Sequence, residues 1–142
     1  MKSFAEIEVG ETAWFEVLYD EKAHADFGRL SGDSSPIHTS DAFCGATRYG
    51  TRLGYGFFLM ALLSRFYGEF LPGGSSVCLA QTGKFINPFH PGDTLRVTGA
   101  VANKVEAAKV VEIKTQILVK KAPGSGLVQM IFEGSGLVEL LR

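Results

Sequence analysis

Cysteine, net charge and long apolar runs are all scarce in this chain, and each scarcity excludes a class of protein. The 142 residues include two cysteines, Cys44 and Cys78, without a CxxC spacing. They predict neither a zinc site nor a disulfide framework, so a reducing cytoplasm is the expected compartment. A net charge of -1 differs from the basic balance of nucleic-acid-binding domains. The longest apolar run, residues 54–63, is shorter than the roughly 20 residues that a membrane-spanning helix needs.

The amino-acid sequence also gives no signal of a targeting segment, an internal repeat or a domain linker. The first ten residues alternate acidic and apolar side chains, which is not the layout of a signal peptide. No cluster of His, Cys and carboxylate side chains has metal-ligand spacing. With 46% hydrophobic and 20% charged residues, the chain has a globular composition and is long enough to bury a core. We therefore expect one domain over residues 1–142, without a metal.

Strand and helix signals alternate in the first part of the chain. Residues 11–18 are rich in β-favouring side chains and predict a strand. Asp20 is a suitable N-cap for a helix through Leu30, which Gly32 would end. The helical spacing of its apolar residues, Leu30 included, places His24 on the face toward solvent.

Two further helical segments follow. Ser40 can cap a short helical turn through residue 46. Residues 54–67 have the sequence GYGFFLMALLSRFY, which is apolar on almost every face. This pattern predicts a central helix that is buried on all sides.

The second half has the alternation of β-strands. The predicted strands are residues 77–87, 94–102, 110–120 and 127–140, with a turn at 123–126 and candidate bulges at Gly134 and Gly136. Long alternating strands joined by short turns favour an antiparallel sheet. The predicted fold class is therefore α+β, with a sheet wrapped around the buried helix.

Residues 31–38, with the sequence SGDSSPIH, carry the strongest chemical signal. Asp33 lies five residues before His38, and Gly32 and Pro36 bend the chain around them. A carboxylate and an imidazole on one turn can activate water and transfer a proton near neutral pH. The alternative is that Asp33 caps a helix and His38 is an ordinary loop residue.

This segment and several others resemble the MaoC-like, (R)-specific enoyl-CoA hydratases, which have the hot-dog fold. The segments that carry the resemblance are FGRLSGD at residues 27–33, PIH at 36–38, ATRYG at 46–50, FINP at 85–88 and PGD at 91–93. Their order makes the match more specific than one Gly-Asp pair. The resemblance covers nearly the whole chain and implies an antiparallel sheet wrapped around a long central α-helix.

The resemblance also implies roles for single residues. The family's catalytic aspartate falls on Asp33, its histidine on His38, and its oxyanion glycine on Gly56. A glycine N–H at a helix N-terminus can bind a thioester oxygen as negative charge develops on it. A serine within the family's site falls on Ser64. On residue chemistry alone, Gly56 also suits close helix–strand packing, and Ser64 suits a bond to a carbonyl one turn earlier.

Two positions depart from the family's pattern. Ser35 stands where the family usually has Asn, and it offers a hydroxyl in place of an amide. Tyr55 stands where the family usually has His, and the larger ring is expected to reshape the acyl pocket. Neither change removes a catalytic group. The expected substrate-binding residues are Ser35, Tyr55 and Ser64.

The expected reaction is the reversible hydration of trans-2-enoyl-CoA to (R)-3-hydroxyacyl-CoA. Asp33 would be the principal base for water, His38 its partner in proton transfer, and Gly56 the oxyanion donor. Coenzyme A is part of the substrate, so no cofactor is expected. The alternatives are a 3-hydroxyacyl-acyl-carrier-protein dehydratase, a hot-dog acyl-CoA thioesterase, and a non-catalytic acyl-CoA-binding subunit. Acyl chain length and preferred direction stay open.

A second copy of the chain is the expected partner besides the acyl-CoA thioester. One sheet can cover only part of an apolar helix, and the strand at residues 77–87 needs cover at its edge. The resemblance implies that subunits pair sheet edge to sheet edge, with the acyl tunnel along their contact. We therefore expect a homodimer or a dimer of dimers, and neither a nucleic acid nor a membrane as a partner.

Overall fold

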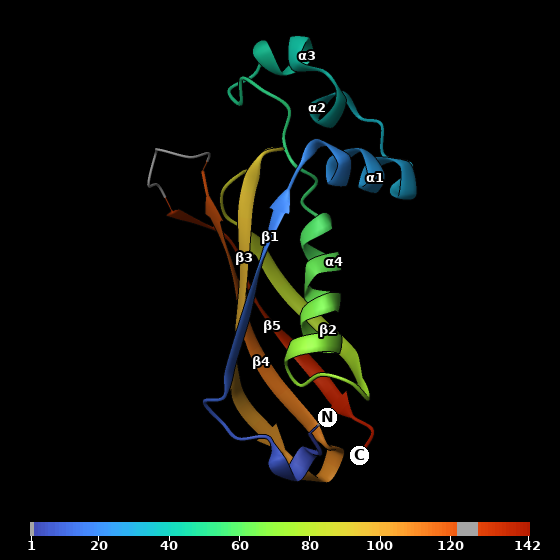
Figure 1. Cartoon of the computed structure of the whole chain (residues 1–142), viewed down its shortest axis with the longest axis vertical. Coiled ribbons are helices and arrows are strands. Elements are labelled where there is room, and N and C mark those ends of the chain that lie inside the picture. The colour runs from blue at the N-terminus through green and yellow to red at the C-terminus, as the bar shows by residue number, and fades with distance from the viewer. Residues whose placement is uncertain (1, 122–127) are drawn as a thin grey trace.

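A five-stranded antiparallel sheet forms the body of the computed structural model, which describes residues 2–121 and 128–142 (Figure 1). The strands are β1 (Thr12–Tyr19), β2 (Ser76–Phe85), β3 (Asp93–Val105), β4 (Val110–Lys120) and β5 (Val128–Leu140). Their spatial order is β1-β3-β4-β5-β2, and every neighbouring pair is antiparallel. The predicted α+β class is confirmed. The predicted turn at 123–126 and the first residue of the predicted last strand lie outside the described residues.

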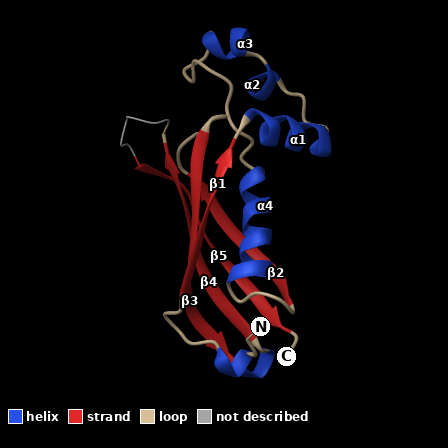
Figure 2. Ribbon diagram, viewed as in Figure 1, coloured by secondary structure: helices blue, strands red, loops and turns tan. Residues whose placement is uncertain are grey.

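The helices occupy two places on this sheet (Figure 2). They are α1 (Glu21–Ser31), α2 (Pro36–Thr39), α3 (Asp41–Gly45) and α4 (Phe58–Arg65), with 3-10 turns η1 (Phe4–Glu6) and η3 (Glu106–Ala108) and a π-helical turn η2 (Phe66–Phe70). Helices α1, α2 and α3 gather at one end of the sheet, whereas α4 lies along one face (Figures 1 and 2). None of the helices within residues 2–121 and 128–142 is long and apolar enough to cross a membrane.

The ends of α1 follow the sequence signals. The Ala23 N–H donates to Asp20 Oδ1 at 2.8 Å, and Gly32 ends the helix with a left-handed φ of 76°. The face of α1 that is buried differs from the prediction. His24 is 5% exposed and Leu30 is 81% exposed, so the expectation that His24 faces solvent is wrong. Tyr19 of β1, His38 of α2 and Tyr55 cover this part of α1, and the sequence period alone does not reveal them.

The central helix begins later than predicted. Residues 54–67 were expected to be helical, but α4 starts at Phe58 and is continued by η2. The Gly54 N–H donates instead to the Phe89 carbonyl at 2.6 Å, and the Tyr55 N–H to Tyr19 Oη at 3.1 Å. These bonds tie residues 54–55 to other elements and delay the helix.

Only one face of α4 is covered in the single chain. Leu59, Leu62 and Leu63 are buried, whereas Phe57, just before the helix, is 70% exposed. The expectation of burial on every side is therefore wrong for one chain, because a single sheet covers one face of a helix. Buried residues of β3, β4 and β5 complete the core beneath it, among them Leu95, Val97, Ile113, Ile117 and Phe132.

The predicted bulges at Gly134 and Gly136 are wrong. The register shifts lie between Cys78 and Ala80 in β2, between Val101 and Asn103 in β3, and between Met130 and Phe132 in β5. A Cβ on Gly136 would lie 2.1 Å from Tyr67 Oη. This glycine therefore permits the close approach of a side chain rather than an irregular strand.

Candidate active site

Asp33 lies in the loop between α1 and α2, at the helical end of the sheet. Its Oδ1 accepts the Ser35 N–H at 3.0 Å. This backbone hydrogen bond, helped by the Ser35 side chain, lowers the pKa of Asp33 below its ordinary value. Because of this lowered pKa, the carboxylate is ionised at neutral pH. The side chain is 45% exposed and is therefore open to a ligand.

His38 faces this carboxylate from α2. Its Nδ1 lies 2.9 Å from the Leu53 carbonyl oxygen, and a carbonyl only accepts hydrogen bonds. Nδ1 therefore carries the proton, and in the neutral ring Nε2 presents a lone pair. Nε2 lies 3.8 Å from Asp33 Oδ2, which is too long for a direct hydrogen bond. Asp33 and His38 thus form a pair of acceptors that can share one small donor.

Gly56 stands at the N-terminal end of α4. The Phe58 N–H donates to the Tyr55 carbonyl and the Leu59 N–H to the Gly56 carbonyl, each at 3.0 Å. The Gly56 N–H itself has no hydrogen-bond partner among residues 2–121 and 128–142. It borders a cavity of about 270 Å³ that His38, Phe85 and Asn87 also line. A backbone donor and the imidazole of His38 therefore meet at one cavity, at the positive end of the helix dipole.

The three predicted substrate-binding residues have different places. Ser35 lies beside Asp33 and holds its carboxylate. Tyr55 is buried between His38 and the Asp33 backbone. Ser64 lies two turns along α4, in a separate cavity of about 350 Å³ that Tyr67 and Gln81 also line. Asp33 lines a cavity of about 430 Å³ and Gly56 lines the one of about 270 Å³, and His38 borders both. Ser35 and Tyr55 contact Asp33 and His38, whereas Ser64 lies apart.

Two residues beneath the site were missed by the sequence argument. His24 Nε2 lies 2.8 Å from the His38 carbonyl oxygen, so this nitrogen donates and Nδ1 accepts. The Tyr19 hydroxyl, 2.6 Å from His24 Nδ1, donates to it and accepts the Tyr55 N–H. Burial raises the pKa of Tyr19 to about 12, which keeps this hydroxyl protonated. The chain Tyr55–Tyr19–His24–His38 therefore has one direction of donation throughout. A small residue one turn after His24, Gly28, was the available sign that something bulky packs on this face.

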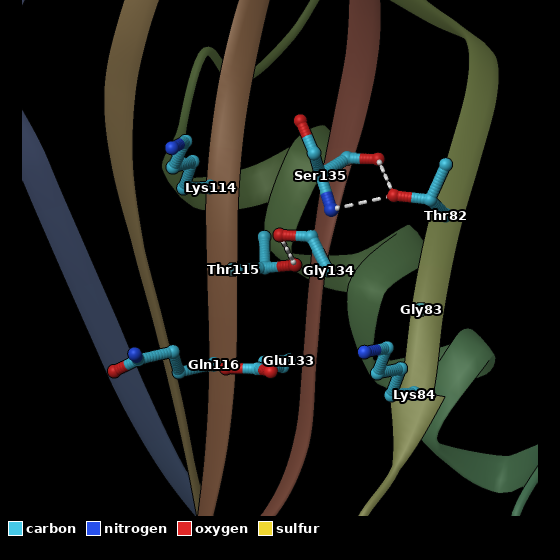
Figure 3. Close-up of a pocket in the computed structure, with 9 residues that line it drawn as sticks. All are labelled: Thr82, Gly83, Lys84, Lys114, Thr115, Gln116, Glu133, Gly134 and Ser135. Carbon is cyan, nitrogen blue, oxygen red and sulfur yellow. Dashed lines mark hydrogen bonds between the residues drawn. The ribbon is translucent and has the colours of Figure 1, made fainter.

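A further hollow lies on the face of the sheet away from α4 (Figure 3). It is lined by side chains of β2, β4 and β5, including Lys84, Lys114 and Glu133. Its hydroxyl groups bond within the sheet: Thr82 Oγ1 accepts the Ser135 N–H at 3.2 Å, and Thr115 Oγ1 donates to the Gly134 carbonyl at 3.4 Å. The hollow contains no imidazole and no helix N-terminus, so the arrangement suited to proton transfer is the one around Asp33 and His38.

Comparison with known proteins gives concordant results. The model of the MaoC like domain matches residues 5–122. A 3-hydroxybutyryl-CoA dehydratase of Methylorubrum extorquens is 31% identical over 140 residues, which are 96% of this chain and 83% of that protein. An (R)-specific enoyl-CoA hydratase of Rhodospirillum rubrum is 30% identical over 112 residues, which are 79% of this chain and 78% of that protein.

Solved structures agree with the fold. The (R)-hydratase of Aeromonas caviae involved in PHA biosynthesis superimposes with a TM-score of 0.85 at 27% identity, over 95% of this chain and 98% of that one. An R-hydratase of Pseudomonas aeruginosa also gives 0.85, at 28% identity, over 97% of this chain and 84% of that one. The hot-dog arrangement expected from the sequence is confirmed.

Proposed function

The chain belongs to the MaoC-like domain family, and from this premise we propose that it is an (R)-specific enoyl-CoA hydratase. Such a hydro-lyase adds water reversibly to trans-2-enoyl-CoA and gives (R)-3-hydroxyacyl-CoA. The observation that carries the proposal is the 3.8 Å separation of two acceptors, Asp33 Oδ2 and His38 Nε2, in a chain of this family.

The geometry of this pair suits the activation of water. A water molecule has two O–H donors, and it can donate one to Asp33 Oδ2 and the other to His38 Nε2. Its lone pairs then point away from both groups, toward C3 of the enoyl thioester. Asp33 acts as the principal base that takes a proton as the new C–O bond forms, and His38 positions the water and shares in proton transfer. The pair returns one proton to C2, so hydroxyl and hydrogen are both accounted for.

Gly56 suits the carbonyl end of the substrate. As water attacks C3, negative charge moves onto the thioester oxygen. The Gly56 N–H, at the positive end of α4, is placed to bind that oxygen within the cavity that His38 also borders. The absence of a side chain lets the thioester approach the backbone closely.

The assay that tests this function measures two signals on trans-2-enoyl-CoA substrates of increasing chain length, beginning with four carbons. Hydration removes the absorbance of the enoyl thioester without releasing free thiol, and chiral analysis of the product should give the (R) alcohol. Asp33→Asn is the matched control. Thiol release would indicate a thioesterase instead, activity confined to acyl-carrier-protein thioesters would indicate the dehydratase, and binding without either reaction would indicate a non-catalytic subunit.

A homodimer is part of the same proposal. Strand β2 is at an edge of the sheet and is exposed on both faces in the single chain, with Leu79 56% and Phe85 52% exposed. Pairing of β2 with a second copy would cover these side chains and the open face of α4, in an obligate interface of roughly 2,000 Å² or more. The two cysteines are unpaired, which suits the proposed cytoplasmic location.

Light scattering of two lysine variants tests the assembly. Leu79→Lys places a charge on the proposed interface, and we expect it to give inactive monomers. Leu18→Lys places the same charge on β1, at the opposite edge, where the leucine is 54% exposed. That variant should remain at least dimeric and active. A wild-type protein that is monomeric and active at micromolar concentration would contradict the assembly.

A further inference from the structure

Tyr55 contacts or adjoins each of the three proposed catalytic groups. Its hydroxyl donates to the Asp33 carbonyl at 2.6 Å. Its ring stacks on the His38 imidazole with centroids 4.1 Å apart and planes at 26°. Its own peptide group leads directly into Gly56. Of the two residues joined to Gly56, Phe57 packs on Phe85, whereas Tyr55 contacts both Asp33 and His38.

The hydroxyl of Tyr55 is directed toward protein rather than toward a ligand. The residue is 4% exposed, and its bond spans from the start of α4 to the α1–α2 loop. Burial raises the pKa of Tyr55, so the hydroxyl stays protonated and keeps donating over the working range of pH. The acceptor is the backbone of Asp33, so this bond fixes the peptide unit that carries the catalytic carboxylate.

Gly28 provides the space that this arrangement needs. A Cβ at position 28 would lie 2.6 Å from Tyr55 Oη and 3.3 Å from Cζ. Gly28 lies inside α1, where alanine favours the helix more than glycine does. The sequence therefore has an unfavourable helix residue at a place where a methyl group would displace the hydroxyl.

From these contacts we infer that Tyr55 is a positioning residue, which holds Asp33, His38 and Gly56 in their reactive arrangement through a hydroxyl that Gly28 accommodates. This inference rests on the proposed hydratase function. It assigns Tyr55 a role in turnover rather than in contact with the acyl chain.

Steady-state kinetics of Tyr55→Phe separate the two roles. The phenyl ring can still stack on His38, but the bond to Asp33 is lost. Misplacement of a reacting group by about 1 Å costs on the order of 100-fold in rate. We expect kcat to fall about 10-fold to 100-fold with KM changed less than about twofold. A raised KM with unchanged kcat would overturn the inference, because it would make Tyr55 a substrate contact.

A double-mutant cycle with Gly28→Ala removes the ambiguity of misfolding. Alone, Gly28→Ala should lower kcat to a similar extent, because the methyl group displaces the hydroxyl. In the Tyr55→Phe background the hydroxyl is absent and the ring atom Cζ, 3.3 Å from the new methyl group, needs to yield by only a few tenths of an ångström, so Gly28→Ala should cause little further loss of kcat. Losses that multiply in the double variant would overturn the inference.

Nuclear magnetic resonance gives a readout that does not depend on the reaction. The chain has three histidines, so the ring signals of His38 can be assigned with His38→Ala. Tyr55→Phe and Gly28→Ala should each shift the His38 ring signals and the Ser34 amide, which follows the Asp33 carbonyl, and should leave the His90 ring unchanged. Unshifted His38 and Ser34 signals would overturn the inference. If the wild-type protein hydrates no enoyl thioester, the proposed function fails, and these signals still decide the role of Tyr55.

Discussion

Two glycines separated by one residue should respond in opposite ways to the same small change. A methyl group built on Gly56 would approach the Phe85 ring at 3.3 Å, a contact that a shift of a few tenths of an ångström relieves. A methyl group on Gly54 would lie 2.4 Å from the ring of Phe89, which is 3% exposed and cannot move freely. Gly54→Ala and Gly56→Ala therefore test packing and catalysis separately.

The structure indicates how large the loss of turnover and the loss of stability should be. At Gly56 the methyl group enters the cavity where the thioester oxygen must reach the N–H, and a displacement of about 1 Å costs on the order of 100-fold in turnover. Stability should hold or rise slightly, because alanine restricts the unfolded chain more than glycine. At Gly54 overpacking costs about 1–3 kcal/mol, which lowers the melting temperature by roughly 2–4 °C for each kcal/mol.

Turnover of enoyl-CoA and thermal unfolding, measured on the same preparations, check this prediction. The reasoning requires Gly56→Ala to be folded and slow, and Gly54→Ala to be less stable with a smaller loss of turnover. If Gly54→Ala has the catalytic defect and Gly56→Ala does not, the oxyanion donor has been placed two residues too late. If Gly56→Ala loses only stability, this glycine serves packing.

Two further predictions concern Asp33 and His38. Asp33→Asn and His38→Ala should each lower turnover by on the order of 10²–10⁴, with unchanged circular dichroism, because each removes a proton-transfer group; a folded variant with near-normal turnover would contradict the assignment. The pKa of Asp33 is lowered in the folded protein, so its contribution to stability is present above the unfolded value of about 3.9 and is lost as pH falls through the folded value. The difference in melting temperature between wild type and Asp33→Asn should therefore shrink below about pH 4, whereas a difference that stays constant down to pH 2 would refute this reading of the carboxylate.

Local signals in the sequence were sufficient to predict that Asp33 and His38 lie close together. Asp20 determines where α1 begins, Gly32 where it ends and Pro36 where α2 begins, so the path from Asp33 to His38 is short and predictable. The same kind of local pattern misplaced His24. Its environment comes from a hydroxyl in β1 five residues earlier, a carbonyl in α2 and a ring before α4, and the last two are 14 and 31 residues away in the sequence.

The start of the central helix could not be predicted from the local sequence either. Gly54 and Gly56 are equivalent by composition and spacing, and both precede an apolar helix. What distinguishes them is the ring that each one faces, because Phe89 is fixed in the core and Phe85 borders a cavity. That difference arises only when the turn between β2 and β3 is placed against the helix. It decides which of the two glycines has an N–H free for a substrate.

The exposed side chains of strand β2 favour an assembly of two copies of the chain. Strands β3 and β4 alternate between buried and open residues, as a sheet with one covered face requires. In β2 the apolar Val77, Leu79 and Phe85 are 44%, 56% and 52% exposed, and this strand is also the edge nearest the open side of α4. Burying a large apolar side chain is worth about 1.5–3 kcal/mol. An apolar edge strand that is open beside the uncovered side of α4 is thus most simply explained by a second copy of the same surface, which would place the Gly56 cavity beside the contact between subunits.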